Sequence, residues 1–192
     1  TALVLLFRDG DGYEAIRYFW IPAEGKVLED KDYSGRFRKW IEEGYIYETP
    51  GRTMDTRYVR NEVCKMTNHF NLSEIYVDRN FQGAQLCTEL TEEGIEMTPF
   101  GQGFTSYAGP CRDFEDLIVE EGLQHGNNPV LRFCAKNTEV QTDPAGNIKP
   151  CKPDHESMLK IDGITATIMA FARASLTAEF ANLSAYEDSE LF

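Results

Sequence analysis

Several features that mark other classes of protein are missing from this sequence of 192 residues, and each absence excludes a kind of function. No G-x-x-x-x-G-K-[ST] motif occurs, so the chain has no P-loop with which to bind ATP. Neither the zinc-protease motif H-E-x-x-H nor the serine-hydrolase motif G-x-S-x-G is present. No apolar run approaches the roughly 20 residues that span a bilayer, and no signal peptide is visible at Thr1. The chain is therefore expected neither to run a P-loop ATPase nor to enter a membrane.

Cysteine and histidine are too few and too scattered to form a recognisable metal or disulfide framework. The five cysteines are odd in number and form no C-x-x-C pair, and the histidines His69, His125 and His155 are isolated from one another. Disulfide scaffolds and zinc sites place such residues at short, regular spacings. The pattern therefore predicts neither, and it fits the reducing cytosol.

Basic residues are scarce, because 19 Lys and Arg face 32 Asp and Glu and leave a net charge of −13. DNA phosphates are bound by local Lys and Arg, so any DNA-binding surface must be a patch on an acidic body. Two groups are candidates for such a patch: Arg52, Arg57 and Arg60, and Lys149, Lys152 and Lys160. Ordinary solvated surface explains either group equally well. The excess of carboxylates also suits a site that holds divalent cations.

The first 21 residues have the pattern of an antiparallel β-hairpin. Thr1 to Arg8 is an apolar run of strand length, Asp9 to Gly12 has the Asp-Gly composition of a tight turn, and Tyr13 to Ile21 is rich in aromatic residues. We interpret Asp9 and Asp11 as turn residues rather than metal ligands, because their spacing does not match a calcium-binding loop.

The rest of the chain alternates between helical and extended patterns, as in an α/β domain. A strand at 74–78, a helix at 81–93 and a strand at 95–99 have the order of a parallel strand–helix–strand layer. Helices are also expected at 34–43, 55–69, 110–121 and 157–181, extended segments at 45–48 and 129–140, and a polar loop at 22–32. A second β-hairpin is expected to turn at 143–147. One domain should take up residues 1–192, with no repeat and no internal boundary.

Two acidic residues occupy positions where carboxylates often have a function. Asp78 ends an apolar strand, and ligands of open α/β sheets bind at the carboxyl ends of strands. Asp162 lies early in an otherwise apolar helix, where an unpaired carboxylate is costly to bury. Both have simpler explanations, since Asp78 could cap the helix that follows it and Asp162 could complement a helix dipole.

Carboxylates on different elements can hold the two cations that assist phosphodiester cleavage. In that chemistry the two ions lie about 3.5–4 Å apart; one activates the attacking water and the other stabilises the leaving oxygen. Such a site needs several acids that converge in space without being adjacent in sequence. Asp78 and Asp162 would supply two of them.

An ordered series of short motifs resembles the large terminase subunits of tailed phages, in the group typified by the HK97-like packaging enzymes. The matching pieces, in family order, are Phe19 to Pro22, Trp40 with Gly44 to Ile46, Thr49 to Gly51 with Asp55, Ile75 to Asp78 with Gln85 and Leu86, Gln102-Gly103 with Ser106, His125 to Arg132, Asn137, Asp143 to Lys149, and Lys160 to Gly163. Each piece alone is weak, whereas the ordered set covers almost the whole chain and is specific.

The resemblance implies a ribonuclease-H-like α/β fold, with a mixed central sheet flanked by helices and an added β-hairpin. It implies a metal-dependent endonuclease domain that cuts concatemeric double-stranded DNA with two Mg²⁺ or Mn²⁺ ions. Asp78 and Asp162 match the family's second and third metal-binding acids, and the hairpin from Asn137 to Lys149 matches one that could gate DNA entry.

The resemblance also implies contacts and partners. Gln102 and Ser106 match residues near the family's cleft, and Lys149 and Lys160 lie close enough in sequence to be further DNA-binding candidates. The implied partners are phage DNA, a terminase ATPase domain, the small terminase subunit and the portal protein. The implied location is the host cytoplasm and, transiently, the procapsid portal.

One departure from the family concerns its first metal-binding acid, which lies on a central strand just upstream of the Thr1 region. We therefore expect that this strand, its acid and an ATPase domain belong to a longer protein, and that Asp55 or Asp143 is a poor substitute for the acid. Two alternatives stay open. A junction-resolving nuclease of the same fold would prefer a four-way junction, and a non-catalytic docking module of the packaging motor would show no metal-dependent cleavage.

Overall fold

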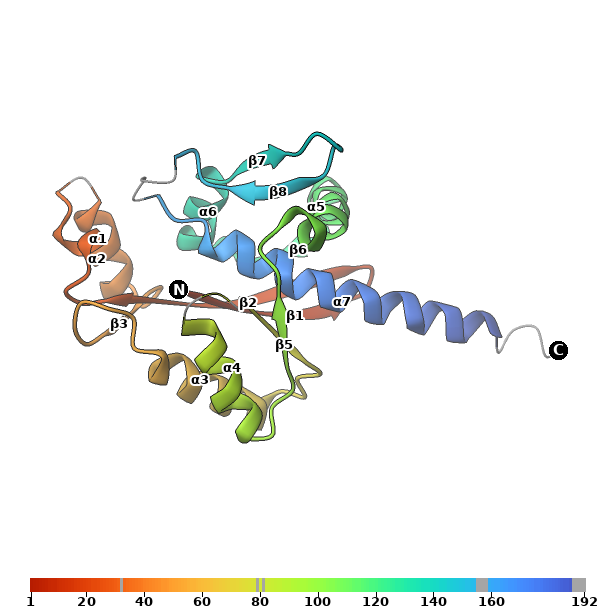
Figure 1. Ribbon diagram of the computed structural model, residues 1–192, viewed down its shortest axis with the longest axis horizontal. Helices are drawn as coiled ribbons and strands as arrows, with labels where there is room; N and C mark the ends of the chain where they lie inside the picture. Colours follow the sequence, from red (N-terminus) through yellow and green to blue (C-terminus); the bar gives the residue numbers. More distant parts are fainter. Residues whose placement is uncertain (32, 79, 81, 155–158, 188–192) are drawn as a thin grey trace.

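A long antiparallel hairpin forms the centre of the molecule (Figure 1). The computed structural model describes residues 1–31, 33–78, 80, 82–154 and 159–187, without the side chains of residue 82 and residues 177–187. Strands β1 (Ala2–Asp9) and β2 (Gly12–Pro22) pair from Ala2 with Phe19 to Asp9 with Gly12. Gly10 has a positive φ of 58°, which glycine adopts without strain in a tight turn. The predicted hairpin at 1–21 is confirmed.

Two of the remaining strands join this hairpin in a four-stranded sheet, and the other four form two separate pairs. β3 (Tyr47–Thr49) and β6 (Leu123–Gln124) pair in parallel with the two ends of β2. β4 (Ile75–Asp78) runs parallel to β5 (Met97–Phe100), and β7 (Glu139–Thr142) runs antiparallel to β8 (Ile148–Cys151). The parallel pair and the second hairpin agree with the sequence. Within the described part of the chain, the edge of β1 away from β2 and the edge of β4 away from β5 are both unpaired.

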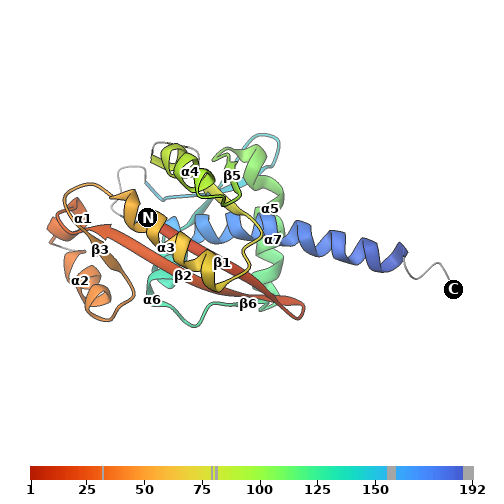
Figure 2. The same cartoon turned by 90° about the horizontal axis from the view of Figure 1, so that it is seen from below.

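Helices cover both faces of the hairpin. Figures 1 and 2 show α3 (Thr56–His69) and α4 (Gln82–Glu92) on one side of it and α7 (Asp162–Glu187) on the other. The apolar stripe of α3 is buried at Val59, Val63 and Met66, as its spacing of four and three residues predicts. Asp55 caps this helix by accepting a hydrogen bond from the backbone of Arg57.

The long helix α7 packs along β1 and then extends beyond the body of the molecule (Figure 1). Of its predicted apolar face, Ile168 and Phe171 are buried, and Ile164 packs against both neighbouring clusters of the core; Ile161 is buried directly before the helix. The helix begins at Asp162, five residues later than its expected start at Ser157, which lies outside the described residues. Within the described part of the chain, no helix is both long and apolar enough to cross a bilayer.

The helices not yet described are α1 (Lys26–Glu29), α2 (Ser34–Glu42), α5 (Phe104–Val119) and α6 (Pro129–Lys136). Three of these four differ from the sequence-based expectation. α2 is as predicted, but α1 lies within the expected polar loop, α5 starts at Phe104 instead of Pro110, and α6 replaces most of the expected extended segment at 129–140.

The helix α6 shows why that expectation was wrong. The side chain of Asn128 accepts hydrogen bonds from the backbone nitrogens of Val130 and Leu131, each at 3.0 Å. Pro129 follows at the first helical position, where its missing N–H has no intrahelical partner to lose. Val130, Leu131, Phe133 and Cys134 are then buried in the core together with α2. The Asn128-Pro129 pair therefore marks the start of a helix, and this capping signal outweighs the β-branched residues that follow it.

Candidate active site

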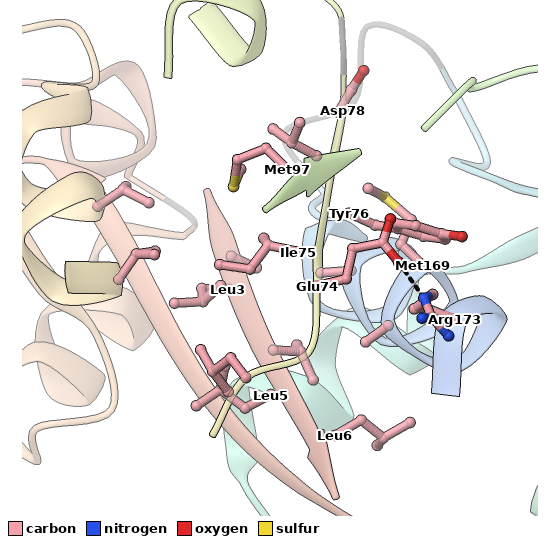
Figure 3. A pocket seen from close by; sticks show the side chains of 18 of the residues that line it. Leu3, Leu5, Leu6, Glu74, Ile75, Tyr76, Asp78, Met97, Met169 and Arg173 are labelled. Atoms are coloured by element: carbon pink, nitrogen blue, oxygen red, sulfur yellow. Dashed lines mark hydrogen bonds and ion pairs between the residues drawn. The ribbon is translucent and has the colours of Figure 1, made fainter. Parts of the chain in front are cut away.

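A cavity of about 740 Å³ lies between the open edge of β1 and the β4–β5 pair. Figure 3 shows Leu3 on the β1 side and Ile75 on the β4 side of this cavity. α7 lines it with the small side chains Ala166 and Ala170 and with Met169. The lining is mostly apolar along the strands; Glu74 and Asp162 also line it, and Asp78 lies at the end where β4 stops. We refer to this space as the β1–β4 cavity.

Asp78 lies at that end, as the last residue of β4 (Figure 3). Its side chain is exposed, and Oδ1 accepts a hydrogen bond from the backbone nitrogen of Asn80 at 3.0 Å. The carboxylate therefore caps the turn that leads into α4, as the simpler explanation predicted. Oδ2 has no hydrogen-bond donor among the described residues, so one oxygen remains available to a ligand.

Asp162 lines the same cavity from the first residue of α7. Its side chain is 44% exposed, and Oδ1 lies 3.9 Å from the Thr1 ammonium. Burial acts to raise the pKa of Asp162, but the positive charges of Thr1, Lys160 and Lys152 hold it below its usual range. The acid is therefore ionised at neutral pH. The Thr1 ammonium exists only where Thr1 is the first residue, so the two lysines are the partners that any form of the chain keeps.

Two glycines set the backbone positions of these acids. A Cβ on Gly83 would lie 1.7 Å from the carbonyl oxygen of Asp78, so the first turn of α4 approaches the end of β4 more closely than any other residue allows. A Cβ on Gly163 would lie 3.0 Å from Leu131 and 3.1 Å from Phe19. α7 thus begins in close contact with α6 and β2, directly beside the second acid.

Gln102 is the third polar residue that the structure brings to this cavity. It follows β5 by two residues, and the last residue of β5, Phe100, pairs with Asp78 in the parallel register. Gln102 therefore lies at the same end of the strand pair as Asp78. Its Oε1 accepts a hydrogen bond from the hydroxyl of the buried Tyr107 at 2.9 Å, and its Nε2 lies 3.7 Å from the sulfur of Met169.

Other predicted site residues do not line the β1–β4 cavity. Ser106 lies in the first turn of α5, and Lys149 lies on β8 with its Nζ 4.9 Å from the centre of the Phe104 ring. Lys160 acts on Asp162 through its charge without lining the cavity. These three remain predictions as DNA contacts.

The two candidate substitutes for the family's first acid are engaged elsewhere. Asp55 pairs with Arg57 at the start of α3, and Asp143 accepts hydrogen bonds from the backbone nitrogens of Ala145 and Asn147 in the turn of the second hairpin. Neither lines the cavity. Among the residues that the structure describes, no group of three or more His, Cys, Asp and Glu side chains could hold a metal ion.

Sequence reasoning missed one ionic contact in the wall of the cavity. Glu74 forms an ion pair with Arg173 of α7 and accepts a hydrogen bond from the hydroxyl of Thr98 (Figure 3). Burial alone would raise the pKa of Glu74, but the Thr98 hydroxyl and the Arg173 guanidinium together lower it. Arg173 is the sole basic residue in the sequence of α7, which is the signal that could have indicated a buried partner.

Comparison with known proteins gives consistent matches over most of the chain. Residues 1–178 match the family described as the terminase large subunit, endonuclease domain. The chain is 31% identical to the terminase large subunit of Enterobacteria phage HK97 over 91% of its own length and 35% of that protein. It is 30% identical to Protein YmfN of Escherichia coli (strain K12) over 96% of its own length and 42% of that protein. The chain therefore spans less than half the length of these relatives.

Two crystal structures resemble the fold. The HK97 bacteriophage large terminase matches with a TM-score of 0.77 and 29% identity, over 90% of this chain and 36% of that one. The large terminase nuclease from thermophilic phage G20c matches with a TM-score of 0.51 and 12% identity, over 64% of each chain. At that identity the second likeness concerns the fold alone. The expected ribonuclease-H-like α/β fold is confirmed by these neighbours.

Proposed function

The chain belongs to the endonuclease-domain family of terminase large subunits, and from that premise we propose that it cuts concatemeric double-stranded phage DNA by metal-dependent hydrolysis of phosphodiester bonds. The observation that carries the proposal is that Asp78 and Asp162 both line one cavity. They come from the end of a strand and the start of a helix, 84 residues apart in sequence (162 − 78), and sequence reasoning chose both for metal binding.

The donor atoms fit a hard divalent cation. Carboxylate oxygens are the ligands that Mg²⁺ and Mn²⁺ prefer, Asp162 is ionised at neutral pH, and Asp78 keeps one oxygen without a donor from the described residues. Two ions held there would activate water and stabilise the leaving oxygen of the phosphodiester. The two acids would hold these ions, while Lys152 and Lys160 add positive charge near Asp162 for the DNA phosphate.

A complete two-metal site needs at least one more acid, and the β1–β4 cavity offers a place for it. The cavity separates two unpaired strand edges, β1 and β4, and apolar side chains such as Leu3 and Ile75 line it. A strand in this space would pair with both edges and join the two sheets. We propose that a segment preceding Thr1 in a longer protein forms this strand, carries the third acid and follows an ATPase domain.

The partners and location proposed for the longer protein follow from the family. They are phage DNA, the small terminase subunit and the portal protein, in the host cytoplasm and transiently at the procapsid portal. Gln102, Ser106, Lys149 and Lys160 remain the proposed DNA contacts, with Gln102 alone lining the cavity.

The test is plasmid nicking with Mn²⁺ by the chain and by a form extended upstream through its own preceding sequence by roughly 15 residues, enough for one strand and its turn. We expect cleavage by the extended form, and its loss in Asp78→Asn and Asp162→Asn variants whose thermal unfolding is unchanged. Asp113→Asn, an exposed acid of α5 outside the cavity, is the matched control and should cleave normally.

The other outcomes separate the alternatives. Absence of cleavage by both folded forms would contradict the proposal and favour a docking module. Faster cleavage of a four-way junction than of linear duplex would favour a junction-resolving nuclease. Full activity in Asp162→Asn would remove this acid from the site.

A further inference from the structure

Gln102 lines the β1–β4 cavity, and the donor of its side-chain amide is incompletely used. Its oxygen is occupied by the Tyr107 hydroxyl at 2.9 Å, whereas the nearest acceptor to its nitrogen is the Met169 sulfur at 3.7 Å. A thioether is a weak acceptor, and an amide nitrogen carries two hydrogens. Among the described residues, no oxygen accepts from Nε2. Gln102 is half-buried, and its weak sulfur partner leaves most of the donor capacity of Nε2 unused, so the amide is suited to a ligand that supplies an oxygen acceptor.

The Tyr107 hydroxyl determines the orientation of this amide. Tyr107 is 2% exposed, and its ring is fixed by an edge-to-face contact with Phe100, whose centroid lies 5.1 Å away. Burial and the charge of Asp78 raise the pKa of Tyr107 well above its usual value, so the phenol stays protonated and can donate. Donation to Oε1 leaves Nε2 on the side of Met169, which also lines the cavity. The reverse orientation would place the carbonyl oxygen on that side, in a cavity that Asp78 and Asp162 already line with negative charge.

We propose that Nε2 of Gln102 donates a hydrogen bond to a non-bridging phosphate oxygen of the DNA bound beside Asp78 and Asp162, and that Tyr107 is the positioning residue that holds the amide in this orientation. The inference rests on the nuclease function proposed above and adds a specific group to it. A neutral donor is useful there, because it contacts an anion beside two carboxylates without forming an ion pair with either of them.

The test compares Gln102→Met, Tyr107→Phe and the double variant in the extended, Mn²⁺-dependent form. Gln102→Met keeps the length of the side chain but removes the amide, and Tyr107→Phe keeps the buried ring but removes the hydroxyl. A hydrogen bond to a charged group has a free energy equivalent to about a tenfold to hundredfold change in rate, so Gln102→Met should slow single-turnover cleavage by that factor. Tyr107→Phe should slow it about tenfold, and the double variant should be no slower than Gln102→Met.

A readout other than activity follows the amide itself. The side-chain NH₂ resonances of Gln102, identified by their disappearance in Gln102→Met, should move in Tyr107→Phe before any DNA is added. In the wild type, adding a short duplex without metal should shift the Gln102 NH₂ resonances from their positions in the DNA-free protein. Tyr18→Phe is the matched control, because it likewise removes a hydrogen-bonded tyrosine hydroxyl, which lies 3.5 Å from the Met66 sulfur, from a residue outside the cavity. It should change neither the rates nor these resonances.

The outcomes are distinguishable from failure of the proposed function. If the wild type cleaves and the two single variants match it, or if their effects multiply in the double variant, the positioning role is wrong. If the wild type does not cleave, the nuclease proposal fails. In that case the positioning role is overturned unless the Gln102 resonances respond both to Tyr107→Phe and to duplex DNA.

Discussion

Individual acidic side chains around the β1–β4 cavity fall into two kinds. Glu74 is 12% exposed and fully engaged by Arg173 and Thr98, so its negative charge is compensated within the protein. Asp162 is 44% exposed and its positive partners act mainly through charge at a distance. Among the described residues, one backbone donor reaches Asp78. A paired acid holds elements together, whereas acids with spare oxygens can bind an added cation, and this separates Glu74 from the proposed metal ligands.

Glu74 leads to a prediction about stability and pH. Its pKa is lower in the folded state than in the unfolded state, so its stabilising contribution is present above the unfolded pKa and is lost as the pH falls through the lower folded value. We expect Glu74→Gln to reduce the free energy of unfolding by roughly 1–3 kcal/mol at pH 7, because the ion pair with Arg173 is lost, and by less at pH 3. Urea unfolding at both pH values measures this.

The control for that experiment is Glu43→Gln. Glu43 pairs with Lys39 at 3.6 Å on the surface, where both side chains are largely exposed, and surface pairs contribute little. Its substitution should leave the free energy of unfolding nearly unchanged at either pH. Equal losses for the two variants, or a loss for Glu74→Gln that does not shrink at pH 3, would show that the buried pair is not the source.

Sequence reasoning singled out two acids of the candidate site but not Tyr107 or Glu74, which also belong to the surroundings of the cavity. Asp78 and Asp162 could be predicted because a carboxylate after an apolar strand, or within an apolar helix, is conspicuous, and the resemblance selected the same two positions. Tyr107 and Glu74 have no such signal. Their partners, Gln102 for Tyr107 and Arg173 for Glu74, meet them only through the packing of α5 and α7 against β5 and β4.

Among helices and strands, the predictions succeeded where one local signal acted alone. The hairpin β1–β2, the helix α3 with its Asp55 cap and the parallel pair β4–β5 follow directly from turn residues and apolar spacing. They failed for α5, where Pro110 lies inside the helix rather than at its start. Four residues at the start of a helix lack intrahelical partners for their N–H groups, but Pro110 is the seventh residue of α5. Burial of Tyr107 and Cys111 explains why the helix forms through it.

The contact between α4 and β4 gives a prediction for an element. Gly83 in the first turn of α4 lies against the carbonyl oxygen of Asp78, where a Cβ would approach within 1.7 Å. Gly83→Ala should therefore displace α4 or the end of β4 and reduce the free energy of unfolding by roughly 1–3 kcal/mol. Cleavage by the extended form should fall as well, because Asp78 moves. Chemical denaturation and plasmid nicking measure the two effects.

Gly109→Ala is the matched control for a helical glycine. Gly109 lies within α5, and a Cβ there would meet no atom within 4 Å. Alanine has a higher helix propensity, but Pro110 restricts the residue before it, so the two effects offset each other and this variant should be nearly as stable as the wild type and fully active. If Gly83→Ala behaved in the same way as Gly109→Ala, the close approach to Asp78 would not be a constraint on the site.

The molecule as a whole combines a net charge of −13 with a proposed DNA substrate. The positive charges of Lys152 and Lys160 lower the pKa of Asp162, and Lys149 lies on the second hairpin over the ring of Phe104. The proposed DNA-binding surface therefore has only a few basic side chains. DNA affinity that depends on a few phosphate contacts is modest and has a shallow salt dependence. Precise binding would then require the tethering that a larger packaging assembly supplies through a high effective concentration.

The two unpaired edges at the β1–β4 cavity give the last prediction, which concerns the completeness of the sheet. Backbone N–H groups on an open edge exchange readily with solvent, whereas a strand paired on both sides protects them. In the form extended upstream by roughly 15 residues, alternate amides of β1 and β4 should exchange at least about tenfold more slowly than in the chain of 192 residues. Amides of β7 and β8, which pair only with each other, should not change and serve as the internal control. Slower exchange in β1 and β4 without metal would place the added strand between them independently of catalysis, and unchanged exchange there would mean that the cavity is not completed by the segment preceding Thr1.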